Sequence, residues 1–471
     1  MTKTASRIFC AIFFVLILTP LVLLPLADNT PTENRPLAQL PALSVDGSFN
    51  LQFPAQMEDY FQDHFFGRSQ MIDIYGRFIG NVFSTSANEK VVWGKEGWLY
   101  FGETVADYEG SAAMTEAQMN RLAISLKLLH KTIQQRDQQL IIAIAPNKNS
   151  IYPQYMPASY YRSAQQSNYD RLMQLQGLHL IDLKAAFLQQ EDILYYQTDT
   201  HWNATGARLA ARIIMQKIQQ LTGIDTAFDW DGVTPQPTDI TGDLAKMLFP
   251  ADTPTEADLY YADTQKNYQT SGGYRVPDDM RITTTSNGAD LSIYILRDSF
   301  TNYLIDYFSN GYASVHYTRQ MPMQFESEFC RQANIILLQM VERRLDELLI
   351  AAPHIYAPAA DAFDITNAQE GLFVHSEKDG NGRRIWGYAP AVVNHLDGLT
   401  VMLKSADSQA AYEAFPILEQ QRYEATGNVP TEQMHEAAFS LLVEDLPPGQ
   451  YEVYLLQQGD TNAVYAGNFH F

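Results

Sequence analysis

The segment LSIYILRDSF, residues 291–300, joins an apolar run to a polar turn that ends in a serine and a phenylalanine. Its first six residues carry no charge and no proline, a pattern typical of a strand that is covered on both faces. Ser299 stands where a helix is predicted to begin, at the carboxyl end of this strand. Because open α/β sheets bind ligands outside the carboxyl ends of their strands, the segment predicts a site at the sheet edge.

Similar apolar runs lie on both sides of this segment along the chain, at residues 140–145, 178–181, 312–316 and 335–340. Between most of them, apolar residues recur at helical spacing, near residues 116–135, 164–175, 205–221, 300–308, 322–332 and 341–350. Thr115 and Gln118 form a capping box before the first of these helices. Alternating strands and helices predict an α/β fold with right-handed crossovers and a doubly wound parallel sheet.

The chain of 471 residues predicts more than one hydrophobic core, because single cores rarely grow past about 250 to 300 residues. We expect the α/β domain at residues 28–351, with an insertion near 222–290, where no period is sustained and Asp, Thr, Pro and Gly are frequent. Short alternating segments in residues 352–471 predict a C-terminal β-sandwich. Such a module on a Pro-containing linker is expected to hold substrate; the alternative is that it packs against the sheet and stabilises it.

The N-terminus has the pattern of a segment that leaves water for lipid. Lys3 and Arg7 precede the apolar residues 8–26, in which Thr19 is the one polar side chain. Nineteen residues at about 1.5 Å each just cross a hydrocarbon core of about 30 Å. The sequence predicts an uncleaved single-pass anchor over residues 1–27, with the rest of the chain outside the cytoplasm. A cleaved signal peptide and a buried core helix are the alternatives.

Composition and charge exclude several classes of function. With 32 basic and 54 acidic residues, the formal net charge is −22, which would repel a nucleic acid backbone. Cys10 and Cys330 are the only cysteines, and Cys10 lies in the apolar segment, so the exported part cannot form an intrachain disulfide. Histidines such as His130 and His316 lack acidic or histidine neighbours at ligand spacing. The sequence therefore predicts no metal site and no cofactor.

Two motifs contain residue types that could act together chemically. Asp199 stands two residues before His201, and a carboxylate at that distance can orient an imidazole that acts as a general base. Ser299 is predicted at a helix N-terminus, whose free N–H groups can stabilise an oxyanion. Each motif alone is more often structural, because Asp-x-His is commonly a hydrogen-bonded loop and Ser is commonly an N-cap. Asp298 is expected to cap the helix rather than to act chemically.

Six motifs occur in one order along the chain: ENR (33–35), DHFFGR (63–68), VWGKEGWLY (92–100), PNK (146–148), TDTHW (198–202) and RDSF (297–300). Together they resemble the SGNH-hydrolase-like domain of the alginate O-acetyltransferase group, of the AlgX and AlgJ type. The resemblance covers roughly residues 30–350. It implies a circularly permuted SGNH sheet, in which Asp-x-His precedes the serine. The β tail resembles the family's carbohydrate-binding appendage only in position and class.

The resemblance also implies roles for single residues. Ser299 would be the nucleophile, His201 its base and Asp199 the carboxylate that orients the base. Independently of the resemblance, Lys148 and Arg319 follow predicted strands and are expected to point into the same crevice, where each contacts substrate or is simply solvated. Trp202 is a further candidate for contact with substrate.

The function implied is an extracytoplasmic O-acetyltransferase that acts on polysaccharide hydroxyls through an acyl-serine intermediate. Acetyl-CoA is not expected outside the cytoplasm, so the family implies a multi-pass membrane-bound O-acyltransferase as the acetyl donor. Two alternatives stay open. One is a polysaccharide acetyl esterase, which differs only in using water as the acceptor, and the other is a polysaccharide-binding or assembly protein without catalytic activity.

Overall fold

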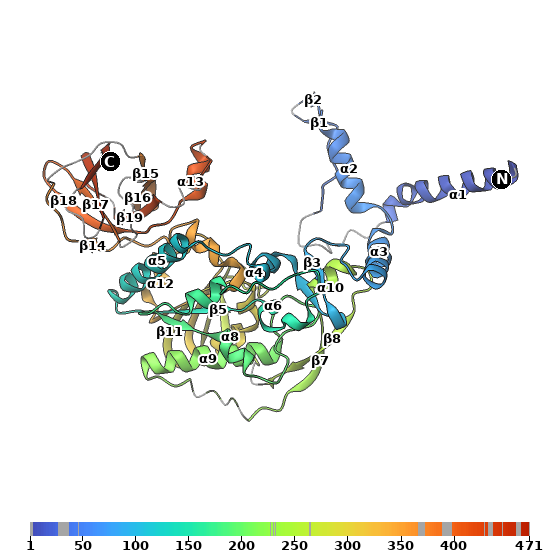
Figure 1. The fold of residues 1–471 in the computed structure, drawn as a ribbon, viewed down its shortest axis with the longest axis horizontal. Coiled ribbons are helices and arrows are strands. Elements are labelled where there is room, and N and C mark those ends of the chain that lie inside the picture. Colours follow the sequence, from blue (N-terminus) through green and yellow to red (C-terminus); the bar gives the residue numbers. More distant parts are fainter. Residues whose placement is uncertain are drawn as a thin grey trace.

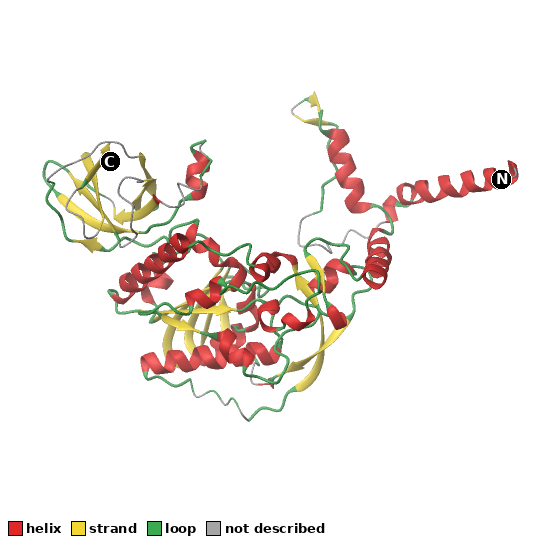
Figure 2. Ribbon diagram, viewed as in Figure 1, coloured by secondary structure: helices red, strands yellow, loops and turns green. Residues whose placement is uncertain are grey.

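The computed structural model describes residues 3–26, 37–45, 47–226, 228, 230, 232–262, 265–365, 373–388, 398–427, 429–431, 437–444, 446–457 and 463–470. The ENR motif at residues 33–35 lies outside these ranges. A seven-stranded sheet forms the centre of the molecule, with helices on both sides (Figures 1 and 2). A second, smaller β structure follows it in the chain, at the upper left of Figure 1.

The central sheet has the strand order β6-β5-β13-β11-β12-β10-β9. The first five strands pair in parallel, and β10 and β9 add two antiparallel strands at one edge. Each of the five apolar runs predicted from the sequence forms one of the parallel strands. The bounds are β6 His179–Ile181, β5 Gln139–Ala145, β13 Ile335–Val341, β11 Ala289–Leu296, β12 Tyr312–Thr318, β10 Arg281–Ser286 and β9 Tyr268–Ser271.

Successive side chains of the parallel strands point to opposite faces, and each face has its own apolar core. Ile293 and Ile295 pack toward α8 (Leu183–Leu188), α9 (Ala204–Thr222) and α11 (Ile305–Gly311). Tyr294 and Leu296 pack toward α5 (Glu116–Gln134), α7 (Asn168–Leu172) and α12 (Glu328–Gln332). The predicted capping box at Thr115 starts α5. The doubly wound α/β fold is therefore confirmed.

Two helices differ from the prediction in type. Residues Ser299–Tyr303 and Glu342–Leu349 form 3₁₀ helices rather than α-helical turns. The insertion supplies the edge strands β9 and β10, the hairpin of β7 (Gln236–Thr241) with β8 (Thr255–Tyr260), and α10 (Asp243–Leu248). Nearer the start of the α/β domain lie β3 (Val91–Trp93), β4 (Leu99–Phe101), α4 (Val105–Glu109) and α6 (Lys148–Ile151).

The C-terminal region forms two antiparallel sheets, β14-β18-β17-β20-β21 and β15-β16-β19. Ile385 from the second sheet shares one apolar core with Val401 and Val453 from the first, which makes the pair a β-sandwich. The bounds are β14 Ala359–Ala360, β15 Phe373–Asp379, β16 Gly382–Tyr388, β17 Leu399–Lys404, β18 Gln409–Ala414, β19 Ala438–Glu444, β20 Gln450–Gln457 and β21 Val464–His470, with the short helix α13 at Gln420–Ala425.

The sandwich packs against the α/β domain through apolar and polar contacts. Phe415 and Ile417 are buried in the same core as the apolar face of α5. The buried Arg121 of α5 donates to the carbonyl oxygens of Pro416 at 2.9 Å and Ala438 at 3.1 Å. These contacts favour the alternative that the C-terminal module stabilises the sheet. They do not test whether the module also holds substrate.

We therefore expect Phe415→Ala to lower the free energy of unfolding by about 3–5 kcal/mol, because the change leaves a cavity in the shared core. Chemical denaturation of the full chain measures the loss. Glu413→Gln serves as the control, because it removes only a half-exposed ion pair with Lys131 and should cost less than about 1 kcal/mol. Equal stabilities for the Phe415→Ala variant and the wild type would mean that the two parts are energetically independent.

The N-terminal residues form three α-helices, α1 (Lys3–Val22), α2 (Phe53–His64) and α3 (Arg68–Phe83). A 3₁₀ helix at Leu24–Leu26 follows α1, and a short hairpin of β1 (Ser44–Val45) and β2 (Ser48–Phe49) precedes α2. They lie at the opposite end of Figure 1 from the C-terminal sheets. Within the described part of the chain, none of the helices combines the length and the hydropathy needed to cross a bilayer. The single-pass anchor predicted from the sequence is not confirmed.

Candidate active site

The loop of residues 196–202 carries two of the predicted site residues and is held from both sides. Lys148, at the start of α6, donates from Nζ to the carbonyl oxygens of Tyr196 at 3.1 Å, Gln197 at 3.2 Å and Asp199 at 2.7 Å. On the other side, Glu256 of β8 accepts the backbone N–H groups of Gln197 and Thr198. The loop therefore has a fixed backbone before the chain enters α9.

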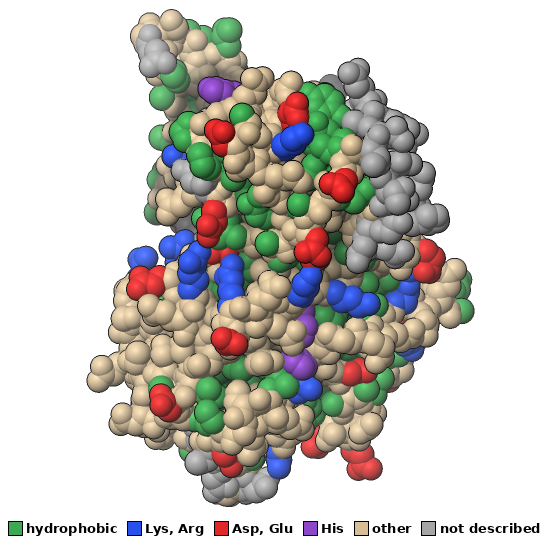
Figure 3. All heavy atoms as spheres, turned by 90° about the vertical axis from the view of Figure 1, so that its left-hand side faces the viewer, with side chains coloured by type: hydrophobic (Ala, Val, Ile, Leu, Met, Phe, Trp, Pro, Cys, Tyr) green, Lys and Arg blue, Asp and Glu red, His purple; other side chains and the backbone are tan. Residues whose placement is uncertain are grey.

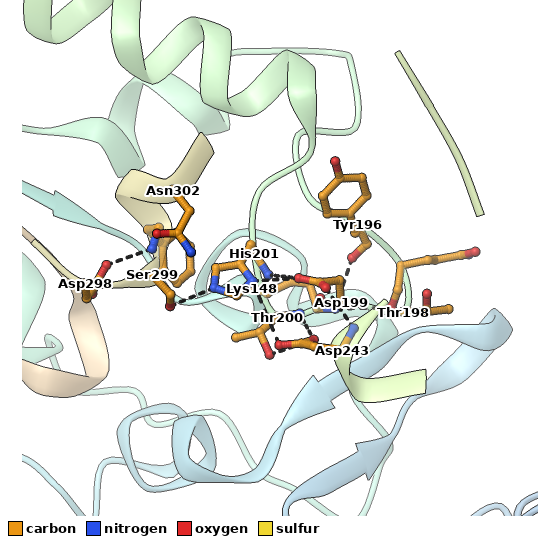
Figure 4. Close-up of polar contacts among 12 residues, drawn as sticks. Lys148, Tyr196, Thr198, Asp199, Thr200, His201, Asp243, Asp298, Ser299 and Asn302 are labelled. Atoms are coloured by element: carbon orange, nitrogen blue, oxygen red, sulfur yellow. Dashed lines mark hydrogen bonds and ion pairs between the residues drawn. The ribbon is translucent and has the colours of Figure 1, made fainter. Parts of the chain in front are cut away.

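Within this loop, Asp199 and His201 form a hydrogen-bonded chain with Ser299 (Figure 4). Asp199 Oδ1 lies 2.7 Å from His201 Nδ1 and also accepts the backbone N–H of His201 at 2.8 Å. His201 Nε2 lies 2.8 Å from Ser299 Oγ. The structure thus brings together the three residues that the sequence predicted as nucleophile, base and orienting carboxylate.

Ser299 is placed by the end of β11 and the first turn of the following 3₁₀ helix. Asp298 caps this turn, because its Oδ1 accepts the N–H of Phe300 at 2.9 Å and its Oδ2 accepts the N–H of Val341 at 2.6 Å. The expected capping role of Asp298 is confirmed. Arg297 donates to the carbonyl oxygens of residues 277 and 279 and so fixes the neighbouring insertion loop.

The electrostatics of the triad favour an ionised carboxylate beside a basic imidazole. Burial opposes ionisation of Asp199, but hydrogen bonds from His201 and the charge of its ring hold the pKa of Asp199 well below its usual range. Burial alone would lower the pKa of His201. The hydrogen bond to Asp199 and the negative charges of Asp199 and Asp243 outweigh burial, so the pKa of His201 is raised. A more basic imidazole accepts the serine proton more readily.

Asp243 is a site residue that the sequence did not indicate. It begins α10 in the insertion, and its backbone N–H donates to Asp199 Oδ2 at 2.8 Å. Its Oδ1 accepts the backbone N–H of Thr200 at 2.7 Å, and its Oδ2 lies 3.9 Å from His201 Nδ1. Burial and the charge of Asp199 raise the pKa of Asp243. No local motif marks this residue, because its partners are 43 and 44 positions away.

We expect Asp243→Asn to move the acid limb of the pH–rate profile to lower pH. The variant keeps a side-chain acceptor for Thr200 but removes a negative charge that raises the pKa of His201, so the neutral, basic imidazole persists at lower pH. The plateau rate should fall by roughly tenfold, less than the loss of the base itself, which contributes about 10²–10⁴-fold. Ester turnover between pH 4 and 9 measures both effects.

The exposed Asp239 of β7 provides the control, as Asp239→Asn changes the same charge in the same insertion away from the triad. An unmoved acid limb in Asp243→Asn, with the plateau lowered, would assign Asp243 a purely structural role.

Two of the three predicted substrate contacts, Lys148 and Trp202, do not line the cavity in front of Ser299. The side chain of Lys148 is only 4% exposed and faces the carbonyl oxygens behind the loop, so it does not line the cavity in front of Ser299. Trp202 is 0% exposed and its ring packs edge-on against Phe300, with centroids 5.0 Å apart. It is a core residue beneath the triad and does not line the cavity, so its position does not support the predicted contact with substrate. Arg319 does line the cavity, where its Nη1 pairs with Asp278 Oδ1 at 2.7 Å.

The cavity in front of Ser299 has a volume of about 970 Å³. Its lining combines acidic side chains with the cationic groups of Lys246, Arg319 and Arg343. Arg343 also lies over the rings of Phe101 and Phe300, at 5.0 and 5.9 Å. The complete lining is Phe101, Asp199, Thr200, His201, Asp243, Lys246, Met247, Pro277, Asp278, Ser299, Asn302, Tyr303, Arg319 and Arg343.

Asp199, His201 and Asp243 also form a group of potential metal ligands, whose donor atoms lie within 4.8 Å of one another. Both oxygens of Asp199 already accept backbone N–H groups, and His201 Nδ1 is engaged by Asp199. His201 Nε2, the remaining ring nitrogen, faces Ser299. Asp199 and His201 Nδ1 are therefore already engaged by hydrogen bonds within the protein.

A comparison with protein families matches residues 91–275 to the model described as "SGNH hydrolase-like domain, acetyltransferase AlgX". The matched range includes Asp199, His201 and Asp243 and ends before Ser299.

Curated relatives are described as "Probable alginate O-acetylase AlgJ". The protein of Pseudomonas putida is 28% identical over 167 residues, which is 34% of this chain and 42% of the relative. That of Azotobacter vinelandii is 26% identical over 191 residues, 39% of this chain and 44% of the relative. The chain thus spans about two fifths of the length of the curated relatives it matches.

Solved structures similar to this chain include Bacillus cereus PatB1, with a TM-score of 0.43 and 17% identity over 53% of this chain and 95% of that one. The O-acetyltransferase domain of Pseudomonas putida AlgJ has a TM-score of 0.37 and 16% identity, over 54% of this chain and 91% of that one. Pseudomonas aeruginosa AlgX has a TM-score of 0.36 and 10% identity, over 82% of this chain and 91% of that one.

Proposed function

We propose that this chain, whose residues 91–275 match the model described as "SGNH hydrolase-like domain, acetyltransferase AlgX", transfers acetyl groups to polysaccharide hydroxyls. The observation that supports the proposal most strongly is the continuous chain from Asp199 through His201 to Ser299, with both contacts at 2.7–2.8 Å. The reaction proceeds in two halves around an acetyl-serine.

In the first half, Ser299 Oγ attacks the acetyl carbonyl carbon of the donor while His201 Nε2 takes the hydroxyl proton. The tetrahedral intermediate collapses to acetyl-Ser299, and His201 returns the proton to the leaving group of the donor. Asp199 holds the proton on Nδ1, so that Nε2 faces the serine as an acceptor, and stabilises the imidazolium. In the second half, His201 takes the proton of a sugar hydroxyl as that oxygen attacks the acetyl carbon, and returns the proton to Ser299 Oγ when the acetyl–serine bond breaks.

Residues 91–275 match an acetyltransferase family model, and this match favours acetyl transfer over hydrolysis. The esterase reading requires the same residues with water in place of the sugar. A purely binding role is disfavoured, because an idle triad has no need to keep the His201–Ser299 contact at 2.8 Å. The curated relatives are described as alginate O-acetylases, which makes a uronate polymer the first acceptor to test. A membrane-bound O-acyltransferase is the proposed acetyl donor.

The decisive experiment supplies 4-nitrophenyl acetate as donor and an alginate oligosaccharide as acceptor. Mass spectrometry should find an added acetyl group on the peptide that contains Ser299 and then on the oligosaccharide. Acetyl-serine that yields only free acetate at every acceptor concentration would identify an esterase. An adduct on another residue, or none, would end the proposal.

We place the catalytic domain outside the cytoplasm, because Lys3 and Arg7 precede the apolar residues 8–26 as in segments that direct export. N-terminal sequencing of the protein from cells distinguishes two cases. If the N-terminus of the protein in the membrane fraction lies upstream of Ala27, the apolar segment is retained. If the N-terminus lies near Asp28, the segment has been removed.

A further inference from the structure

A second cavity, of about 750 Å³, lies between the central sheet and the C-terminal sandwich. Its walls come from the ends of β10 and β12, from α12, and from the turn at residues 380–381 between β15 and β16. Figure 3 views the side of the molecule where α12 and the sandwich lie, and Lys and Arg side chains form a band across that side. The volume is within the range of ligand clefts, about 300–1,000 Å³.

Aromatic rings form one wall of this cavity. The rings of Tyr294 and His316 are stacked at 5.3 Å with planes 8° apart, and those of His316 and Phe329 at 4.1 Å and 7°. Tyr294 and His316 are buried, whereas Phe329 is 49% exposed. Burial lowers the pKa of His316 to about 4, so this ring is neutral at physiological pH. An apolar ring supported from behind by two others is left open to a ligand.

Hydrogen-bonding side chains surround the rings. The cavity is lined by three glutamines, Gln320, Gln324 and Gln332, together with Asn381. Arg281 donates to Gln320 Oε1 at 2.7 Å, and Arg331 pairs with Glu326 at 2.6 Å. Amide groups both donate and accept hydrogen bonds, as sugar hydroxyls require. An exposed ring beside several amides matches the two surfaces of a pyranose, an apolar C–H face and a polar edge.

The strand end at residues 318–319 separates this cavity from the catalytic one. Thr318 lines the second cavity and Arg319 lines the cavity of Ser299. Successive residues of a strand face opposite sides of the sheet, so the two cavities lie on either side of one strand end. A chain of sugars bound in the second cavity could therefore reach the first over this edge.

We propose that the second cavity binds pyranose residues of the acceptor polysaccharide, with one ring stacked on Phe329, while a neighbouring part of the same chain reaches Ser299. This inference rests on the proposed function for its acceptor, but binding in the second cavity does not require the chemistry at Ser299.

The test measures binding directly by calorimetry, with the full chain and two probes, an alginate hexasaccharide and the neutral cellohexaose. Phe329→Ala should weaken binding of the preferred probe about tenfold, because it removes an aromatic stacking partner. Phe329→Tyr keeps the ring and should bind as the wild type does. Tyr161→Ala removes another exposed aromatic side chain that lines neither cavity and serves as the control.

Hydrogen exchange should show that the bound probe protects peptides containing residues 320–332 and 378–384. A probe that binds only when uronate carboxylates are present identifies an anionic acceptor, and equal binding of both identifies a neutral pyranose as sufficient. Wild-type affinity in Phe329→Ala, protection confined to other segments, or no binding of either probe would overturn the inference. Ester turnover of the same wild-type sample reports the proposed chemistry separately, so a failure of one is not a failure of the other.

Discussion

Ser299→Ala is expected to lower ester turnover by about 10⁵- to 10⁶-fold, because nucleophile removal from a serine triad commonly costs this much in kcat. In this chain the expected loss of turnover follows from the removal of one atom, Ser299 Oγ. His201 Nε2 lies 2.8 Å from Ser299 Oγ, and after the substitution the base faces a methyl group that has no proton to give. Acetyl transfer to an oligosaccharide should stop with ester turnover, because both halves of the reaction pass through the same oxygen.

The folded structure should tolerate this change. Ser299 Oγ contributes one hydrogen bond, worth about 1 kcal/mol in stability. The measurement pairs burst and steady-state kinetics with a thermal melt. Ser111→Ala, which removes an exposed hydroxyl, is the matched control and should retain full turnover. If Ser299→Ala kept more than a small fraction of wild-type turnover at an unchanged melting temperature, another residue would be the nucleophile.

Asp199→Asn is expected to lower turnover near neutral pH by about 10⁴-fold, the size of the effect in a serine protease. The surroundings of Asp199 give a specific reason. Oδ1 receives N–H groups from the backbone and ring of His201, and Oδ2 receives the backbone N–H of Asp243. An asparagine offers only one oxygen. If its NH₂ faces His201, it donates to Nδ1 and leaves the proton on Nε2, which then cannot accept the proton of Ser299. If its NH₂ faces Asp243, it lies opposite the backbone N–H of Asp243, which is also a donor.

The effect on stability also has a defined pH dependence. Because the folded protein holds the pKa of Asp199 below its unfolded value of about 3.9, its carboxylate stabilises the fold above that pH and loses the contribution as pH falls through the folded pKa. The wild type should therefore exceed the asparagine variant in stability at neutral pH, and the difference should shrink in acid. The deficit in turnover of the variant relative to the wild type should narrow in alkali, where the serine needs less help from its base.

Kinetics and melts of Asp199→Asn, His201→Ala and the exposed-site control Asp192→Asn between pH 3 and 10 test these expectations together. Near wild-type rates in Asp199→Asn would remove Asp199 from the catalytic unit.

The parallel part of the sheet could be predicted because buried strands leave a signal in the sequence itself. Residues 140–145 are an uninterrupted apolar run, residues 335–340 contain one polar residue, Gln339, and the two segments form neighbouring parallel strands. The antiparallel strand β10 has the sequence RITTTS, in which one isoleucine stands among polar residues, as is common in loops. Its pairing depends on β12, more than twenty residues away, so no local pattern reveals it.

In the candidate site, too, some residues could be predicted from local motifs and others could not. His201 and Ser299 lie in short motifs that can be read in sequence order, and their contact across 98 positions followed from the fold. Asp243 lies in an aperiodic insertion and reaches the triad through tertiary structure alone. Lys148 was recognised as a residue near the strand end, but its direction depends on where the carbonyl oxygens of a distant loop come to rest.

That orientation of Lys148 has a consequence for how alkaline inactivation should be interpreted. Burial lowers its pKa to about 8, and a neutral amine has two N–H groups for the three carbonyl oxygens that the ammonium satisfies. The backbone beneath Asp199 should therefore loosen as pH rises past 8, and amide exchange in residues 196–201 should accelerate with the same midpoint as the fall in turnover. The alkaline midpoint of a rate profile would then report the deprotonation of Lys148, a residue that contacts neither the acetyl donor nor the sugar.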